Sequence, residues 1–589
     1  MRGRGVLASV DALASSAGAA LLRAGGSAAD AAVGASAVLA VTTQHMCGMG
    51  GDLVAMVHPG GVAAPRALLA VGRAGSGASA GQLRAEGLTS VPLRGDLCAV
   101  TVPGCVDGWL ALHAAHGRLP LADVLAPAVG LAEDGFPISP LLAAALPRVA
   151  DVPGAGELVG SLPAAAGDVR RRPGVARALR AIAAEGRSGW YGGEFGAGLL
   201  ALAGRLRPGL FTADDLTTDL AEWAQPLAVP SPGGGSLLAP PAPSQAYLVL
   251  AARRIVELVG DPPDPEDPRW PHLVVEASRA AGRDRVALLH DGADLGRVLH
   301  PAELRRRAAL VDLRAAATEG PPTHGGGTIY LCAVDSDGMA VSLSQSNAAG
   351  FGAHLVVPEV GVFLQDRGLG FSLHPESPAE LGPGRRPPHT LAPVLAVGAD
   401  GRARVVAGTM GGDAQPQIVL QLLLRLAAGQ TPAAAVAAPR VALAGPLGTG
   451  FDTWEAGPGG FPSVPTVRVE AGAPAGWVTG LRRLGHVVET APSGGGFGHA
   501  QLAVLAGAGA AHGPWQRPPT RGQAPVPPYP SEASPCRCQE GRGRRSVVEV
   551  PVLTGVPITS TRSPVAPAGR APARRTVLTP CASPRTGRR

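Results

Sequence analysis

Hydrophobic positions recur at helical spacing through much of the first half of the chain. Apolar residues repeat at intervals of three and four over residues 13–22 and 28–39, and Ser27 stands where the N-cap of the second stretch is expected. Two Ala-rich helices are therefore predicted. The helical pattern returns at 110–136 and, interrupted by Pro and Gly, over 175–290.

Strand patterns dominate the second half. Residues 328–334 and 339–344 have strand composition, and the Asp-Ser-Asp-Gly sequence at 335–338 is a turn, so these residues predict a β-hairpin. The other predicted elements are strands at 53–58, 361–364, 392–397 and 404–407, and a helix at 418–428. Together they predict an α/β (α+β) chain whose sheets are covered by helices.

The periodic pattern ends near residue 512. Residues 513–589 hold 15 Pro and 13 Arg against three Glu, and they are predicted to form a disordered tail. Residues 1–512 carry 38 basic and 42 acidic side chains, and aromatic residues make up only 3% of the chain. The overall charge of +6 therefore comes from the tail, and nucleic-acid binding by the body has no support.

Targeting and metal signals are absent from the sequence. The start has no continuous apolar core with a cleavage site, and Arg23 and Asp30 interrupt the apolar stretch at 12–41, so neither a secretory signal nor a membrane span is predicted. The seven cysteines are widely spaced and form no CxxC pair, which predicts reduced thiols and no metal site. The predicted location is the cytoplasm.

A glycine run meets the first predicted strand at Gly325-Gly-Gly-Thr328. One interpretation is an ordinary turn. The other is self-cleavage, in which Thr328 Oγ attacks the carbonyl of Gly327 and the resulting ester hydrolyses. Thr328 would then carry a free α-amine, with a pKa near 7.7–8.0, that can serve as the general base of its own hydroxyl.

Several blocks of the sequence resemble the γ-glutamyltransferases, a family of N-terminal nucleophile hydrolases. The longest block is 328–347, which is similar to the start of the family's small subunit. The other blocks, in the family's order, are 23–32 (RAGGSAADAA), 47–53 (CGMGGDL), 102–109 (VPGCVDGW), 351–353 with 357–358, 384–390 (GRRPPHT) and 408–412 (GTMGG). The resemblance covers roughly residues 5–507.

The resemblance implies a four-layer αββα sandwich and a set of catalytic residues. The family's nucleophile falls on Thr328, so cleavage of Gly327–Thr328 would divide the chain into a large subunit (1–327) and a small one (328–512, followed by the tail). The hydroxyl that hydrogen-bonds the nucleophile falls on Ser346. The glycines whose N–H groups hold the oxyanion fall on Gly411 and Gly412. No metal or organic cofactor is implied.

The substrate-binding positions depart from the family pattern. The arginine that binds the substrate α-carboxylate falls on Arg73, and the family's Ser-Ser pair becomes His389-Thr390. An amide-bearing residue becomes Arg367, and the Asp that binds the substrate α-amine becomes Gly370. The attack on an amide is thus expected to be retained, while Asp366 and Asp413 stand as possible substitutes for the absent carboxylate.

These residues support three functional hypotheses. The first is a self-cleaving enzyme that transfers or hydrolyses a γ-glutamyl amide of the glutathione type, with an amino acid, a peptide or water as acceptor. The second is an amide hydrolase for acids without an α-amine, of the glutaryl or oxamate type. The third is an unprocessed, non-catalytic scaffold. Partners are therefore small molecules and, after cleavage, the two subunits, with no nucleic acid or membrane.

Overall fold

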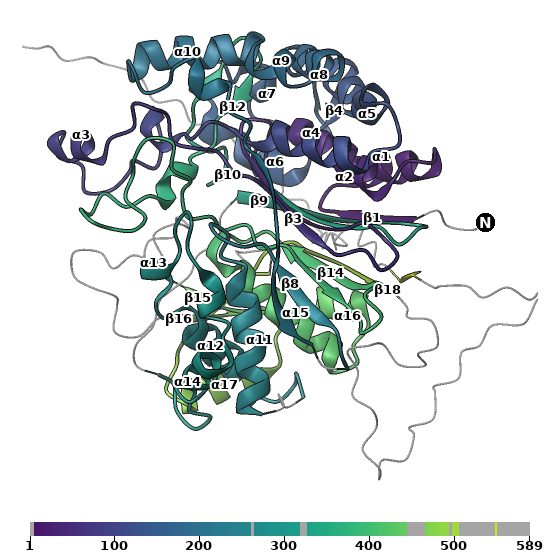
Figure 1. Cartoon of the computed structure of the whole chain (residues 1–589), viewed down its shortest axis with the longest axis vertical. Helices are drawn as coiled ribbons and strands as arrows, with labels where there is room; N and C mark the ends of the chain where they lie inside the picture. The colour runs from purple at the N-terminus through teal and green to yellow at the C-terminus, as the bar shows by residue number, and fades with distance from the viewer. Residues whose placement is uncertain are drawn as a thin grey trace, which may run out of the picture. The chain divides into compact units, whose positions relative to one another are not determined.

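Two six-stranded sheets lie at the centre of the computed structural model, which describes residues 5–231, 233–260, 264–317, 327–444, 466–493, 497–505 and 548–549 (Figure 1). The first sheet has the order β1-β9-β10-β2-β3-β6, with bounds Gly5–Ser9, Gly327–Asp335, Ala340–Ala348, Asp52–His58, Arg66–Ala70 and Ala221–Ala224. The second has the order β19-β18-β14-β13-β8-β7, with bounds Val548–Glu549, Ala500–Leu505, Ala403–Thr409, Val394–Val397, Ser236–Ala239 and Leu227–Pro230. Neighbouring strands in both sheets are antiparallel.

The two sheets pack face to face. Successive side chains of a strand point to opposite sides of its sheet. In β9, Tyr330, Cys332 and Val334 accordingly belong to a cluster that also holds Leu395 of β13 and Val406 of β14. The intervening apolar residues of β9 belong to the core on the other side of the sheet.

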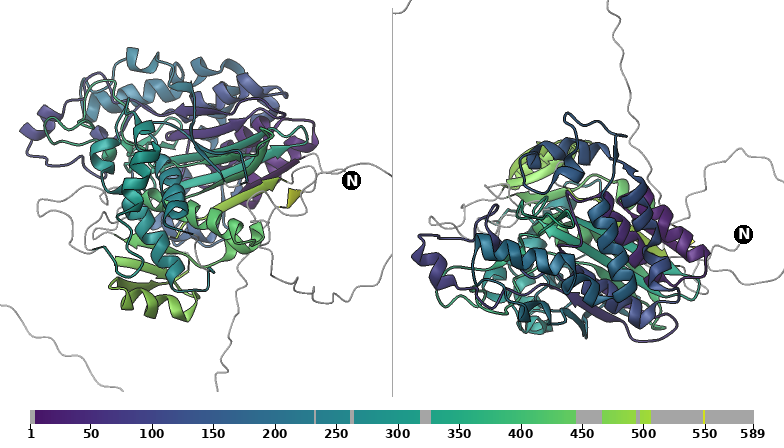
Figure 2. Two further views of the ribbon diagram at one scale, coloured as in Figure 1. Left: turned by 60° about the horizontal axis from the view of Figure 1, so that its bottom comes forward. Right: turned by 90° about the horizontal axis from the view of Figure 1, so that it is seen from above.

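Helices cover the outer face of the first sheet (Figure 2). They are α1 (Ala12–Arg23), α2 (Ala28–Thr42) and α4 (Cys105–His116), with α5 (Leu121–Asp134) and α8 (Pro173–Glu185) packed beyond them. Helix α2 is buried along its whole length, and Ser27 and Asp30 form a capping box at its first turn. A helix rich in Ala can be enclosed in this way because its small side chains let neighbouring elements approach closely.

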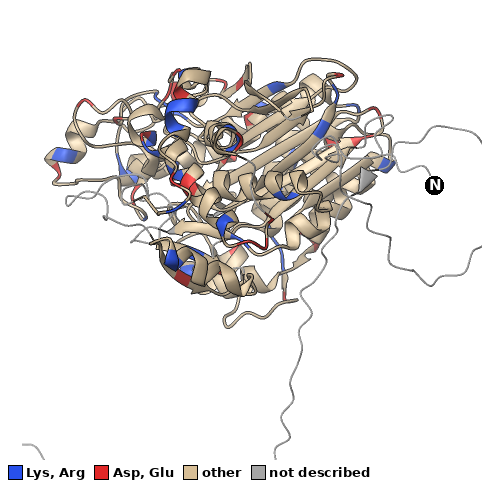
Figure 3. Cartoon of the chain, turned by 90° about the horizontal axis from the view of Figure 1, so that it is seen from below, with Lys and Arg blue, Asp and Glu red and all other residues tan. Residues whose placement is uncertain are grey.

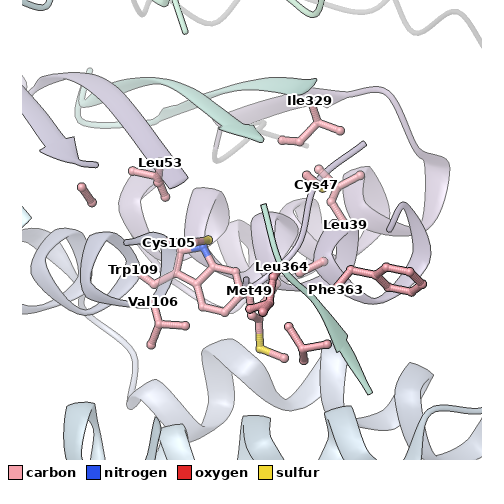
Figure 4. Packing of buried hydrophobic residues seen from close by; sticks show 14 of the residues in the cluster. Leu39, Cys47, Met49, Leu53, Cys105, Val106, Trp109, Ile329, Phe363 and Leu364 are labelled. Atoms are coloured by element: carbon pink, nitrogen blue, oxygen red, sulfur yellow. The ribbon is translucent and has the colours of Figure 1, made fainter. Parts of the chain in front are cut away.

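Figure 4 shows part of the core between the first sheet and these helices. Trp109 of α4 is fully buried, and its indole Nε1 donates a hydrogen bond to Ser36 Oγ of α2 at 2.8 Å. Met49 and Leu364 belong to the same cluster. The segments that carry these two residues therefore anchor the loops around the candidate site to the core.

The second sheet is covered by α11 (Tyr247–Val259) and α15 (Gln415–Ala427). The layers thus run helix, sheet, sheet, helix, and the predicted αββα sandwich is confirmed. A smaller sheet with the order β15-β16-β17 (Val441–Ala444, Thr466–Glu470, Val487–Ala491) extends this side of the molecule. It shares a hydrophobic cluster with α12 (Arg269–Gly282), α14 (Pro301–Ala308) and α17 (Ala475–Arg483).

Shorter elements connect these layers. Two-stranded sheets are formed by β4 with β5 (Phe136–Pro137, Val169–Arg170) and by β11 with β12 (Val356–Val357, Val362–Phe363). The remaining α-helices are α3 (Ala80–Ala85), α6 (Pro140–Ala145), α7 (Gly156–Val159), α9 (Arg187–Tyr191), α10 (Glu194–Leu206), α13 (Arg285–Leu288) and α16 (Pro432–Ala437). Among the described helices, none is long and apolar enough to cross a membrane.

Most predicted elements are confirmed, and one prediction is wrong. The hairpin at 328–344 is β9 and β10, and the two Ala-rich helices are α1 and α2. Residues 175–290, however, are not helical throughout: β6, β7 and β8 lie within them and contribute to both central sheets. These strands are only four residues long and lie among Pro and Gly, so the pattern of breaks concealed them. Two of them, β6 and β7, are edge strands.

The remaining predictions concern charge, thiols and the tail. Figure 3 shows Arg interspersed with Asp and Glu over the described body, as expected from the sequence. The four described cysteines (Cys47, Cys98, Cys105 and Cys332) are buried and free. The predicted disordered tail lies outside the described residues, except for Val548–Glu549, which pair with β18. All described residues belong to one unit, Met1–Val552.

Candidate active site

Thr328 and Ser346 meet at the end of the β9–β10 hairpin. Thr328 Oγ1 donates a hydrogen bond to Ser346 Oγ at 3.0 Å, and both residues are buried. The register of the hairpin shifts between Gln345 and Ala348, so two residues of β10 lie opposite the single residue Thr328 of β9. Such a bulge redirects side chains locally, and here Ser346 faces Thr328.

Ser346 is held by further donors. Its Oγ accepts hydrogen bonds from the N–H of Ala348 at 2.8 Å and from Arg367 Nη2 at 3.0 Å. Ala348 has a φ of 73°, a left-handed conformation that brings its N–H back to Ser346. The hydroxyl oxygen of Ser346, which contacts Thr328, is therefore fixed by its surroundings before any substrate binds.

Arg367 connects two of the predicted site loops. It lies in a short 3₁₀ turn and is fully buried, and its second amino group, Nη1, donates to Thr390 Oγ1 at 2.9 Å. Burial lowers the pKa of Arg367 to about 10, while the carboxylates of Asp52, Asp366 and Asp413 act in the opposite direction. The guanidinium therefore stays charged at neutral pH, beside Ser346.

His389 holds the Thr390 loop to the first sheet. Its Nε2 donates to Asp52 Oδ2 at 3.1 Å, and its Nδ1 accepts from the N–H of Leu391 at 3.3 Å. Burial, together with the nearby charge of Arg367, lowers the pKa of His389 to about 4, so the ring is neutral. With both nitrogens engaged, His389 acts in the described structure to position Thr390.

Asp52 was not singled out from the sequence, although it lies in the glycine-rich block at 47–53. Its Oδ1 accepts hydrogen bonds from the N–H groups of Gly72 and Gly104, at 2.9 and 3.1 Å, and from Gln365 Nε2 at 2.9 Å. One buried carboxylate thus joins four loops around the site. Its position after two close-packed glycines was the only available signal.

Gly411 and Gly412 form the turn between β14 and α15. Their φ angles are 141° and 54°, which favour glycine. Among the described residues, neither N–H group has a hydrogen-bond acceptor, so both are available to an oxyanion. Gln245 Nε2 donates to the carbonyls of Thr390 and Gly412, at 2.8 and 3.0 Å, and ties this turn to the Thr390 loop. Nothing in the sequence around Gln245 indicated this role.

Arg73 lies at the rim of the site. Its side chain is 36% exposed, its Nη1 donates to the carbonyl of Gly384 at 3.0 Å, and it lies 3.8 Å from Asp291. The preceding residue, Gly72, is held by Asp52. The structure therefore attaches Arg73 to the loop that leads to Thr390, and it shows no contact with Thr328 among the described residues.

Gly370 opens onto a pocket beside Thr390. The pocket is lined by Arg285, Val286, Leu289, Leu369, Gly370, Ser372, Ser377, Ala379, Pro388, Thr390 and Asp413. A Cβ placed on Gly370 would lie 2.6 Å from the carbonyl oxygen of Pro388, a distance that real Cβ atoms do not adopt. The absent carboxylate of the family therefore has no room in the present backbone.

Neither suggested substitute presents its carboxylate in the manner of the missing Asp. Asp413 forms an ion pair with Arg285 at 3.1 Å, and both side chains are buried. Asp366 Oδ1 accepts from the N–H of Ala349 at 2.8 Å, and burial raises the pKa of Asp366 to about 7. In the described part of the chain, Asp413 is therefore engaged by a guanidinium, and Asp366 is engaged at one oxygen by a backbone N–H.

The sequence profile of the gamma-glutamyltranspeptidase family matches residues 14–515. The chain belongs to this family. It is 35% identical to the oxamate amidohydrolase proenzyme of Klebsiella pneumoniae over 518 residues, which cover 84% of this chain and 93% of that protein. It is 34% identical to the glutathione hydrolase-like YwrD proenzyme of Bacillus subtilis, with 73% and 83% covered.

Solved structures support the same assignment. The cephalosporin acylase of Bacillus halodurans has a TM-score of 0.76 to this chain and is 30% identical, with 85% of this chain and 92% of that chain covered. The gamma-glutamyltranspeptidase family fold, an αββα sandwich of the N-terminal nucleophile hydrolases, is therefore shown both by the two central sheets and by this similarity. The chain is an enzyme of the acyltransferase and amide hydrolase type.

Proposed function

We propose that this protein cleaves itself at Gly327–Thr328 and hydrolyses amides of short carboxylic acids that lack an α-amine, of the oxamate type. The single observation that carries the proposal is the buried guanidinium of Arg367, one hydrogen bond from Ser346. The large subunit would comprise residues 1–327, and the small subunit would begin at Thr328.

Charge decides between the two classes of acyl donor. A γ-glutamyl donor carries an α-ammonium, which the family binds with a carboxylate and a neutral amide. In this chain those positions are Gly370 and Arg367, so a neutral group is replaced by a cation and the carboxylate is absent. An ammonium would be repelled there, whereas a carboxylate can form charge-assisted hydrogen bonds with a guanidinium.

The position of Arg367 also favours a short acid. Arg367 and Thr328 share Ser346 Oγ as a hydrogen-bond partner, at 3.0 Å each. A carboxylate bound to Arg367 would therefore lie close to the carbonyl that Thr328 attacks. In oxamate the carboxylate and the amide carbonyl are adjacent carbons, and the similarity to an oxamate amidohydrolase agrees with this geometry.

The proposed mechanism uses residues of this chain alone. After self-cleavage, the α-amine of Thr328 accepts the proton of Thr328 Oγ1 as that oxygen attacks the amide carbon, and Ser346 orients the hydroxyl. The N–H groups of Gly411 and Gly412 stabilise the resulting oxyanion. Collapse of this intermediate expels the amine with a proton and leaves an ester on Thr328, which water then hydrolyses.

A γ-glutamyl amide is the second candidate donor. Arg73 is retained where the family binds the α-carboxylate, and one relative is named as glutathione hydrolase-like. This donor would need another partner for its α-ammonium. Its carboxylate would be held at the rim of the site by Arg73 instead of by Arg367.

A direct comparison of donors tests the proposal. Mature enzyme, verified by denaturing mass spectrometry to begin its small subunit at Thr328, is assayed for amine release from oxamate, a glutaryl amide and a γ-glutamyl amide. We expect kcat/KM for oxamate to exceed that for the γ-glutamyl amide by roughly 100-fold, the discrimination that a mispaired charge produces. A faster γ-glutamyl reaction would contradict the proposal, and an uncleaved, inactive chain would favour the scaffold hypothesis.

A further inference from the structure

A second group of buried polar side chains lies between α12 and the small sheet. His272 and Glu276 are four residues apart on α12, so they share one face of the helix. His486 lies in the turn between α17 and β17. All three are at least 95% buried, and each directs one ligand atom toward the others, with all three atoms within 4.8 Å of one another.

We propose that His272, Glu276 and His486 bind a divalent transition-metal ion, with Zn²⁺ as the best match. Two imidazole nitrogens and one carboxylate oxygen form a ligand set that this class of ion favours, with the fourth position left for water. The reaction of the candidate active site does not use this group, and the absence of CxxC pairs gave no signal for it in the sequence.

The distances suit such an ion. Ligand atoms around a tetrahedral Zn²⁺, each about 2.0–2.1 Å from the metal, lie roughly 3.3 Å from one another. His272 Nδ1 and His486 Nε2 are 2.8 Å apart, and His486 Nε2 and Glu276 Oε1 are 3.9 Å apart. The first distance must open and the second close by about half an ångström. The third pair, His272 with Glu276, lies within 4.8 Å and must close by more, which side-chain rotations supply.

The outer contacts orient the ligand atoms. His272 Nε2 lies 2.8 Å from the carbonyl oxygen of Asp312, and the N–H of Ala317 donates to Glu276 Oε2 at 3.3 Å. These contacts leave His272 Nδ1 and Glu276 Oε1 directed at the centre of the group. A histidine that binds a metal with one nitrogen and a backbone carbonyl with the other is the usual arrangement in metal sites.

Aromatic packing fixes the helices next to the three ligands. Trp270 of α12 stacks on Trp477 of α17, with ring centroids 5.4 Å apart and 21° between the planes. Trp477 Nε1 also donates to the carbonyl of Pro265 at 3.0 Å. A preformed site needs ligands whose backbones are fixed in this way.

The site would join the two products of cleavage. His272 and Glu276 precede Thr328 in the chain and His486 follows it, so after cleavage the ion would connect the large subunit to the small one. This linking role rests on the proposed self-cleavage, but the metal site itself does not. Uncleaved Thr328→Ala protein is therefore expected to bind the ion as tightly as mature enzyme.

A metal-free arrangement makes a competing prediction. His486 Nε2–H can donate to His272 Nδ1, while Arg279 Nη1 lies 3.4 Å from Glu276 Oε1 and offsets its charge. In that case no ion is bound, and removing either imidazole costs only a hydrogen bond.

The test is metal binding by the full chain. Protein stripped with a chelator is titrated with Co²⁺, whose visible absorption reports tetrahedral coordination, and with Zn²⁺ in competition. We expect one ion per chain in the wild-type and Thr328→Ala proteins, and affinity reduced by roughly 100-fold or more in His486→Asn. The control His374→Ala, which removes an exposed histidine, should bind normally.

Glu276→Gln provides the second variant, because it keeps the shape and the hydrogen bond to Ala317 while removing the charge. A loss of at least about tenfold in affinity supports the site, even if His486→Asn fails to fold. No binding by wild-type protein, or the same affinity in wild-type and Glu276→Gln, overturns the proposal and leaves the hydrogen-bonded histidine pair as the explanation. Loss of binding in His374→Ala alone would assign the ion to the surface and overturn it as well.

Discussion

The nucleophile side and the recognition side of the site differ in how closely they follow the family. Thr328, Ser346, Gly411 and Gly412 match the family pattern, and the structure brings Thr328 and Ser346 into hydrogen-bond contact. On the recognition side, the resemblance puts Arg367 in place of an amide-bearing residue and Gly370 in place of a carboxylate. Under the proposed function, the chemistry of attack and the choice of substrate are carried by separate parts of the chain.

The difference follows from the elements that carry each side. Thr328 and Ser346 lie on paired strands at the centre of a sheet, where neighbouring strands on both sides restrict change. Arg367 and Gly370 lie in a short turn after β12, and His389 and Thr390 precede β13. Loops tolerate substitution more readily than the sheet that supports them, so specificity can change while the nucleophile stays.

The largest expected effect is on the nucleophile side. Thr328→Ala removes the attacking oxygen, so the chain should remain uncut and amide hydrolysis should fall by roughly 10⁴-fold or more. Denaturing mass spectrometry and amine release measure the two outcomes. Thr328→Ser keeps a hydroxyl and is the matched control, which should still cleave. An alanine variant that is cut and active would remove Thr328 from the mechanism.

A substitution on the recognition side should change the hydrolysis of the two donors to different extents. Arg367→Gln restores the family's amide, and we expect kcat/KM for oxamate to fall by roughly 10–100-fold through loss of a charge-assisted contact. Hydrolysis of a γ-glutamyl amide should be less affected, because a repelling charge is removed. Only cleaved protein is compared, since Arg367 also contacts Ser346.

Arg84→Gln is the matched control for this substitution. Arg84 pairs with Glu380 at 2.7 Å, and both side chains are partly exposed. Arg84→Gln should leave kcat/KM for both donors within about twofold of wild type, because partly exposed ion pairs contribute little. If Arg367→Gln lowers kcat/KM equally for oxamate and the γ-glutamyl amide, Arg367 does not select the donor.

The site cannot be returned to the family pattern by one substitution. Gly370→Asp would place a Cβ 2.6 Å from the carbonyl of Pro388. We expect this crowding to lower the free energy of unfolding by about 1–3 kcal/mol without producing γ-glutamyl activity. Gly130→Ala, where an added Cβ meets nothing within 4 Å, should not destabilise and is the control in thermal unfolding. A stable, γ-glutamyl-specific Gly370→Asp enzyme would contradict the proposed function.

Asp366 should make stability depend on pH. Burial raises its pKa from 3.8 to about 7, so the folded protein binds this proton more tightly than the unfolded chain. Stability from this group is therefore lost as pH rises from about 4 to about 7. The free energy of unfolding of Asp366→Asn should exceed that of wild type by on the order of 1–3 kcal/mol at pH 8, and the two should be equal at pH 4.

The measurement for Asp366 is chemical unfolding at several pH values. Asp151→Asn, which changes an exposed aspartate, is the control and should run parallel to wild type. A difference between Asp366→Asn and wild type that stays constant with pH would show that the Asp366 carboxyl titrates normally in the folded protein.

The smallest expected effect is at Arg73. If Arg367 binds the carboxylate of a short acid, Arg73→Ala should change kcat/KM for oxamate by less than about threefold, since Arg73 is partly exposed and pairs with backbone and Asp291. A larger KM for the γ-glutamyl amide in the same variant would show that only the longer donor reaches the rim. A large loss with oxamate would reverse the assignment of the two arginines.

Sequence reasoning predicted the parts of the molecule that local pattern specifies. The hairpin at 328–344, the Ala-rich helices and the pairing of Thr328 with Ser346 follow from alternation, composition and family motifs. The strands β6, β7 and β8 were missed because they are short and bordered by Pro and Gly. Long-range polar contacts were also missed, because no periodicity indicates that His389 meets Asp52 or that His272 meets His486.

The order of the strands gives cleavage a lasting effect on the mature enzyme. In the first sheet, β9 and β10 would belong to the small subunit, yet they are bordered on one side by β1 and on the other by β2, all hydrogen-bonded in register. The proposed subunits could thus not separate without dismantling the sheet. After unfolding, two separate chains would have to meet again to refold. The lifetime of the active mature enzyme would therefore be set by its rate of unfolding.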